Sequence, residues 1–179
     1  CSSDLNGMTP AIVEGVRSDA YDVGFCSMSE GETDLCFTPI LSQEYATIVN
    51  KKHPLASLAG QPMKLEDLEP YEILTYPENS PVGRIIKKEL RKHNLKATHY
   101  GYDETTIGGY TAINQVVAIV ADTMLLKQFD NLVHLKVELE AEARLVYMVY
   151  HRNNYLTPAV KNYIQHVLDK GPEFGSVPT

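Results

Sequence analysis

The sequence has few of the features that mark membrane proteins, metalloproteins and disulfide-rich domains. It contains three cysteines and no Cys-x-x-Cys pair, so neither a disulfide framework nor a zinc site is indicated. Its longest apolar run, Val116–Ala121, is far shorter than the ~20 residues that a membrane helix needs. No basic-then-apolar signal sequence opens the chain, and we therefore expect a soluble, cytoplasmic protein that contacts no membrane.

Basic charge is also scarce. The chain has 16 Lys and Arg against 23 Asp and Glu, a net charge of −7 at pH 7. Because phosphate contacts need clustered basic side chains, we do not expect this chain to hold nucleic acid by itself. The densest basic stretch, Arg84–His93, includes Ile85, Ile86 and Leu90 at helical spacing. This pattern predicts the solvated face of an amphipathic helix rather than a DNA-binding patch.

The motifs of the common enzyme classes are missing as well. There is no nucleophile elbow, no phosphate-cradling glycine loop, no His-Glu-x-x-His and no acidic metal cluster, and Gly108-Gly109 lies in a helical pattern. The six histidines are dispersed, and His53 precedes a proline in an expected surface turn. We therefore predict no catalytic residue, no metal and no cofactor. Cys26 is expected to be a buried, inert thiol, because a redox sensor needs an exposed thiol of lowered pKa.

What the sequence does contain is an alternation of short apolar strands with helical patterns, which predicts an α/β protein with a largely parallel sheet. The expected strands span residues 21–26, 35–39, 45–49, 73–76, 98–102, 116–120 and 145–150, preceded by Ser2 to Asn6. The expected helices span residues 9–18, 64–68, 80–94 and 105–114, with a last helix that starts at Thr157 and is capped by Gly171.

Three of these helices begin with the same pair of residue types. Thr9-Pro10, Ser80-Pro81 and Thr157-Pro158 each place a hydroxyl at the N-cap and a proline at the first helical position. The hydroxyl accepts a hydrogen bond from a free backbone N–H group, and the missing N–H of the proline costs nothing there.

Three segments, in this order, carry a resemblance to a known family: Tyr21-Asp22-Val23-Gly24-Phe25, His53-Pro54-Leu55-Ala56 and Leu156-Thr157-Pro158-Ala159-Val160. Together they resemble the effector-binding domain of LysR-type transcriptional regulators, and the similarity runs from about Gly7 to Gly171.

The resemblance implies a type II periplasmic-binding-protein-like fold, in which two Rossmann-like α/β subdomains are joined by crossing strands. Residues 1–44 with 144–179 would form subdomain I, and residues 45–143 would form subdomain II. The crossing strands are expected near Gln43 to Ala46 and near Arg144 to Val146. By the same comparison, subdomain I lacks its N-terminal strand and helix.

The same resemblance implies a regulatory function without catalysis. The two subdomains would close around a small metabolite, an anion or an amino acid, and shift a two-state equilibrium that the full-length regulator transmits to DNA. Contact with DNA would need an N-terminal winged helix-turn-helix that lies outside these residues. The full-length protein would be a homodimer or homotetramer, with the helix at 80–94 as a candidate dimer contact.

Two candidate effector-binding residues belong to subdomain I. In open α/β sheets, ligands bind beyond the C-terminal ends of strands, where helix N-termini present free N–H groups. Thr9 follows the expected strand Ser2 to Asn6, and its position resembles one at which family members bind the effector. Ser27 follows the strand that ends at Cys26. The alternatives are that Thr9 only caps its helix and that Ser27 is an exposed turn residue without a ligand.

Four further candidates lie between an expected strand and helix of subdomain II. Tyr100 and Tyr102 would supply a hydroxyl and an aromatic wall, and Thr105 would cap the following helix. Asp103 would disfavour an anionic effector if it pointed inward, so we expect it to point away or to bind a donor group of the ligand.

Two other functions stay open at the level of sequence. One is a solute-binding protein of similar bilobal fold, for which Cys1 would mimic a lipid-anchored cysteine. The other is an enzyme of this fold, such as a dehydratase acting on an aromatic-pathway acid, although the sequence shows no paired acid and base.

Overall fold

A computed structural model of the chain describes residues 9–170, so the expected strand at Ser2 to Asn6 and the cap at Gly171 lie outside the described residues. The helices are α1 (Thr9–Arg17), α2 (Pro81–Lys92), α3 (Glu104–Thr111) and α4 (Pro158–Lys170), with 3-10 turns η1 (Pro54–Leu58), η2 (Leu65–Leu68) and η3 (Met124–Gln128). The strands are β1 (Val23–Cys26), β2 (Leu35–Gln43), β3 (Tyr45–Asn50), β4 (Pro62–Met63), β5 (Ile73–Thr75), β6 (Ala97–His99), β7 (Val117–Ala121), β8 (Leu132–Val137) and β9 (Arg144–His151).

The chain folds into two compact units, and one of them is discontinuous in sequence. Unit 1 comprises Cys1–Gln43 and Arg144–Thr179, and unit 2 comprises Glu44–Ala143. The chain therefore leaves unit 1 after β2 and re-enters it at the first residue of β9.

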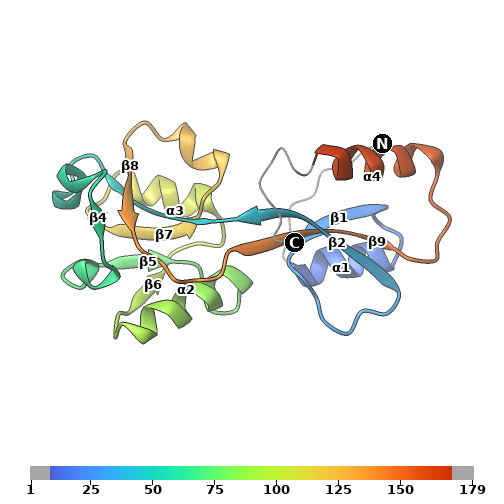
Figure 1. Cartoon of the computed structure of the whole chain (residues 1–179), viewed down its shortest axis with the longest axis horizontal. Coiled ribbons are helices and arrows are strands. Elements are labelled where there is room, and N and C mark those ends of the chain that lie inside the picture. The colour runs from blue at the N-terminus through green and yellow to red at the C-terminus, as the bar shows by residue number, and fades with distance from the viewer. Residues whose placement is uncertain (1–8, 171–179) are drawn as a thin grey trace. The chain divides into compact units, whose positions relative to one another are not determined.

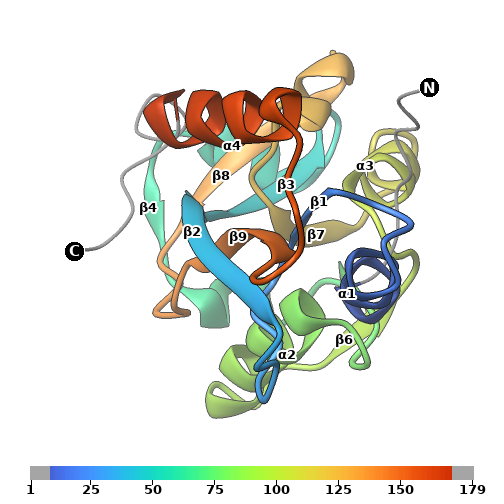
Figure 2. The ribbon, with the colours of Figure 1, turned by 90° about the vertical axis from the view of Figure 1, so that its right-hand side faces the viewer.

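Unit 1 contains a three-stranded antiparallel sheet in the order β1-β9-β2. α1 and α4 lie on opposite faces of this sheet (Figures 1 and 2). The buried core on the α1 side consists of Val13, Val16, Cys26, Leu35 and Val149. On the α4 side, Phe25 of β1 meets Tyr163 of α4 edge to face, with ring centroids 6.5 Å apart. β1 alternates between the two helices because successive side chains of a strand point to opposite faces.

Unit 2 contains a six-stranded sheet in the order β4-β8-β3-β7-β5-β6, with α2 and α3 on opposite sides (Figure 1). Its central strand β7 is buried at every position, as expected for a strand covered on both faces. β5 runs parallel to β6 and β7, and β4 runs parallel to β8, whereas β3 is antiparallel to β7 and β8. The expectation of a largely parallel sheet is therefore wrong: the sheet of unit 2 is mixed, and that of unit 1 is antiparallel.

Two of the expected helix starts are confirmed by their hydrogen bonds. Ser80 accepts from the N–H of Gly83 at 3.0 Å, and Thr157 accepts from the N–H of Val160 at 3.3 Å. The amphipathic character of α2 is confirmed too, since Val82, Ile86 and Leu90 are buried.

The environment of His53 differs from the sequence expectation. It is not in an exposed turn: its side chain is 3% exposed, and its ring lies 4.8 Å from that of Tyr71. Its Nδ1 accepts a hydrogen bond from the N–H of Leu55 and so caps η1. Burial lowers the pKa of His53, which favours the neutral ring that capping requires.

Candidate functional site

Four polar side chains of unit 1 gather where β1 and β2 end beside the start of β9. Ser27 directly follows β1 and is 8% exposed, so it is not an exposed turn residue. Its backbone N–H donates to Oγ1 of Thr9 at 3.3 Å, which ties the end of β1 to the first turn of α1. The two hydroxyl residues predicted for unit 1 are therefore in direct contact.

Arg144, the first residue of β9, joins this pair to β2. Its Nε donates to Oγ of Ser27 at 3.1 Å, and its Nη1 donates to Oε1 of Gln43 at 3.2 Å. Because β9 is the middle strand of the sheet, one guanidinium reaches the ends of both neighbouring strands. We call Thr9, Ser27, Gln43 and Arg144 the strand-end cluster.

Cys26 lies beside this cluster and has the properties expected of an inert thiol. It is 2% exposed, and burial raises its pKa to about 11, although the charge of Arg144 acts in the opposite direction. A thiol with such a pKa is almost entirely protonated at neutral pH and is a poor nucleophile.

The candidates in unit 2 lie in the segment that runs from the end of β6 into the first turn of α3. Asp103, not Thr105, caps α3: its Oδ1 accepts from the N–H of Thr106 at 2.8 Å, and its Oδ2 accepts from the Thr106 hydroxyl at 2.9 Å. The expectation that Thr105 caps this helix is therefore wrong. Thr105 is exposed within the first turn of α3. The carboxylate of Asp103 is occupied by its own helix, which satisfies two donors of that turn.

The two tyrosines follow β6, which ends at His99, earlier than the sequence indicates. The ring of Tyr100 stacks on that of Tyr110 in α3, with centroids 3.9 Å apart and planes tilted by 38°. Tyr100 and Tyr102 are 47% and 62% exposed, so both rings offer apolar surface and a hydroxyl to solvent.

The start of α3 is held against the sheet by a buried tyrosine. The Tyr76 hydroxyl donates to the carboxylate of Glu104 and accepts from the N–H of Ala121 at 3.0 Å. This arrangement fixes the segment that contains Asp103 and Thr105 at the ends of β5 and β7.

The sequence did not indicate Gln43 or Arg144 as members of a site. Arg144 is 117 residues from Ser27 and 101 from Gln43, so no local pattern signals their contact. Over residues 9–170, the structure contains no group of three or more His, Cys, Asp or Glu side chains that could hold a metal ion. In the same range, no helix is long and apolar enough to cross a membrane.

The fold is similar to several solved regulatory domains. The effector-binding domain of QuiR in complex with shikimate superposes with a TM-score of 0.79 at 23% identity, covering 95% of this chain and 81% of that one. The regulatory domain of Synechocystis PCC6803 CcmR in complex with 2-PG superposes with a TM-score of 0.75 at 14% identity, covering 94% of this chain and 82% of that one. The BenM effector-binding domain with benzoate superposes with a TM-score of 0.72 at 18% identity, covering 96% of this chain and 80% of that one.

At these identities the superpositions show the fold, an α/β architecture like that of type II periplasmic-binding-like effector domains. A comparison with curated proteins gives no match. The family model of the LysR substrate binding domain matches residues 5–172, nearly the whole chain. The chain belongs to the LysR substrate binding domain family.

Proposed function

We propose that this chain is the regulatory domain of a LysR-type transcriptional regulator, and that it binds a small-molecule effector that controls transcription by the full-length protein. The observation that carries the proposal is the strand-end cluster, where hydroxyl and guanidinium groups meet at strand ends in a chain of this family. Family membership favours this function over that of a solute-binding protein.

Units 1 and 2 are, in this proposal, the two regulatory subdomains, and each contributes to effector binding. Thr9 and Ser27 act from unit 1. Tyr100, Tyr102 and Thr105 act from unit 2, where exposed rings and a helix N-terminus are available. Asp103 acts by capping and stabilising that helix N-terminus, since its carboxylate already accepts two hydrogen bonds from Thr106.

The effector is a small anion or an amino acid. The solved relatives are complexes with shikimate, 2-PG and benzoate, and the donor groups of the strand-end cluster suit a ligand of this kind. Binding is expected without conversion of the ligand. The full-length protein binds DNA through a winged helix-turn-helix and acts as a homodimer or homotetramer, with α2 as a candidate dimer contact.

The experiment is a thermal unfolding screen with small carboxylates and amino acids. A ligand at 100 times its Kd stabilises the folded state by ~2.7 kcal/mol, so an effector raises the thermal midpoint. We expect Thr9→Val to reduce the shift, because it removes the hydroxyl that bonds Ser27. Thr157→Val is the matched control, since Thr157 has the same residue type at the start of α4 and is exposed.

Two outcomes would count against the proposal. A stabilising ligand that the protein converts into product would indicate an enzyme. Equal shifts in Thr9→Val and in the wild type would remove Thr9 from the site.

A further inference from the structure

We propose that Arg144 is the anion receptor of the effector site, and that its guanidinium binds a carboxylate or phosphate group of the effector. This inference rests on the proposed function and assigns a residue and a ligand chemistry to it. All of the contacts that support it lie within unit 1.

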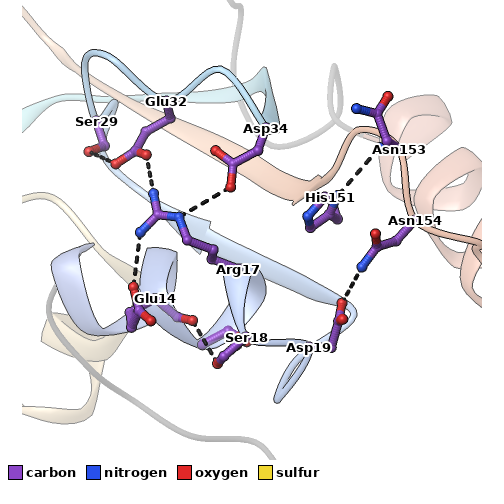
Figure 3. A network of polar contacts seen from close by, with 11 residues as sticks. Glu14, Arg17, Ser18, Asp19, Ser29, Glu32, Asp34, His151, Asn153 and Asn154 are labelled. Carbon is purple, nitrogen blue, oxygen red and sulfur yellow. Dashed lines mark hydrogen bonds and ion pairs between the residues drawn. The ribbon is translucent and has the colours of Figure 1, made fainter.

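Two arginines of the chain are not exposed, Arg17 and Arg144, and their surroundings differ in charge. Arg17 is surrounded by acid: its guanidinium contacts Glu14 at 2.9 Å, Asp34 at 3.2 Å and also Glu32 (Figure 3). Arg144 has no ion pair with any residue in the range 9–170, and its two partners are neutral. A partly buried cation is normally paired, so Arg144 is the arginine whose counter-charge is missing from the described fold.

The guanidinium of Arg144 has a fixed orientation. Nε is held by Ser27, just after β1, and Nη1 is held by Gln43, at the end of β2, so the plane of the guanidinium is set before any ligand arrives. Two of its five N–H groups are used in this way, and the other three have no partner among the described residues. A planar donor with parallel N–H groups matches a carboxylate or phosphate, which it binds through two hydrogen bonds.

The strand-end cluster offers a ligand mainly hydrogen-bond donors. Oγ of Ser27 accepts from Arg144, and Oγ1 of Thr9 accepts from the N–H of Ser27. Neither hydroxyl donates its proton to a residue in the range 9–170, and a guanidinium has no acceptor. The cluster therefore presents donors and a positive charge. A neutral ligand could accept hydrogen bonds here but would leave the charge unpaired, and a cationic ligand would be repelled.

The experiment is an NMR titration of the intact chain, followed through the Nε–H resonance of Arg144, which the bond to Ser27 protects from exchange with solvent. The probes are benzoate, inorganic phosphate and the neutral analogue benzamide, at constant ionic strength. We expect a saturable shift of this resonance with benzoate, with phosphate or with both, and none with benzamide. The first two probes distinguish a carboxylate from a phosphate effector.

Arg144→Gln should weaken binding of the active anion at least about tenfold, because a charge-assisted hydrogen bond contributes more than a neutral one. Arg152→Gln is the matched control: it removes the same charge from an exposed residue just after β9 and should bind like the wild type. Arg144→Lys keeps the charge but loses the planar donor, and we expect intermediate affinity. If Arg144→Gln fails to fold, the wild-type titration and Arg144→Lys still test the proposal.

The inference is overturned if no anion moves the Arg144 resonance, if benzamide moves it as benzoate does, or if Arg144→Gln binds as tightly as the wild type. The proposed function fails separately. If an effector from the thermal screen binds Arg144→Gln with the affinity of the wild type, the regulator function is supported but Arg144 is not part of the effector site. A wild-type chain that binds nothing in either measurement contradicts both.

Discussion

Gly24 is the position in β1 where α1 approaches the sheet. A Cβ atom on this residue would lie 2.5 Å from Cγ2 of Ile12 in α1 and 3.1 Å from Cγ1 of Val149 in β9. Real side chains do not approach so closely, so glycine is needed here for space and not for an unusual backbone conformation. The close approach of α1 also keeps Thr9 within reach of Ser27.

Gly24→Ala is therefore expected to lower the free energy of unfolding by about 1–3 kcal/mol, the usual cost of overpacking a core. Chemical denaturation measures the change. Gly109→Ala is the control, because its Cβ would lie 3.6 Å from the ring of Phe129, an ordinary contact, within α3. The free energy of unfolding of that variant should rise by up to ~1 kcal/mol, because alanine has a higher helix propensity than glycine. A Gly24→Ala protein as stable as the wild type would show that α1 can move away from β1.

At the scale of residues, effector binding by Thr9 and Ser27 stays a prediction, and the structure adds contacts that the sequence does not indicate. The sequence indicates Thr9 and Ser27 because each stands at the end of an element, and the structure joins them directly. Arg144 could not be found in this way, because its partners are brought to it by strand pairing. His53 was placed at the surface from its neighbouring proline, whereas packing against Tyr71 buries it.

At the scale of elements, α2 is tied to η2 by an ion pair that depends on pH. Nδ1 of His93, at the C-terminal end of α2, lies 2.6 Å from Oε1 of Glu66 in η2. The Glu66 carboxylate raises the pKa of His93, and His93 in turn lowers the pKa of Glu66. Glu89, one turn earlier on α2, also faces His93, with its carboxylate 3.6 Å from Nε2.

The directions of these two pKa shifts define the pH range in which the ion pair stabilises unit 2. The His93 contribution is complete below the ordinary histidine pKa of 6.5 and is lost as the pH rises through the raised value. The Glu66 contribution is complete above the ordinary glutamate pKa of 4.5 and is lost as the pH falls through the lowered value. The pair is therefore fully charged between about pH 4.5 and 6.5.

We expect His93→Gln to lower the thermal midpoint most at about pH 5.5 and progressively less as the pH is raised through the His93 pKa. Thermal unfolding of both proteins across this range measures the difference. His99→Gln, at an exposed histidine of β6, is the control for the substitution itself. A His93→Gln deficit that stays constant up to high pH would mean that the ring stabilises α2 by packing alone.

The sequence identifies most elements but not how the strands pair. The helix starts at Ser80 and Thr157 are local hydrogen-bonding arrangements, so residue types suffice to predict them. β8 was not expected, because His134 and Lys136 interrupt its apolar residues. The apolar run of β7 is typical of parallel strands covered on both faces. Its pairing with β3 is nevertheless antiparallel, because the direction of a strand depends on how the chain connects it to its neighbours.

At the scale of the whole molecule, the two units differ in how their cores are built. The main core of unit 2 contains 22 buried apolar residues, all between Glu44 and Ala143. The described core of unit 1 has five, and they come from both of its segments, on either side of unit 2 in sequence. Every strand pairing of unit 2 also joins residues inside that single continuous segment.

Residues 44–143 alone are therefore expected to fold, since about 100 residues with one contiguous core match an ordinary domain. The fragment should unfold cooperatively on heating, with amide chemical shifts in β3 and β7 close to those of the intact chain. Its counterpart, residues 1–43, should not fold alone, because β9, the central strand of its sheet, belongs to the other segment. A fragment 44–143 without a cooperative transition would mean that unit 2 depends on unit 1 for its stability, despite a core that lies entirely within its own sequence.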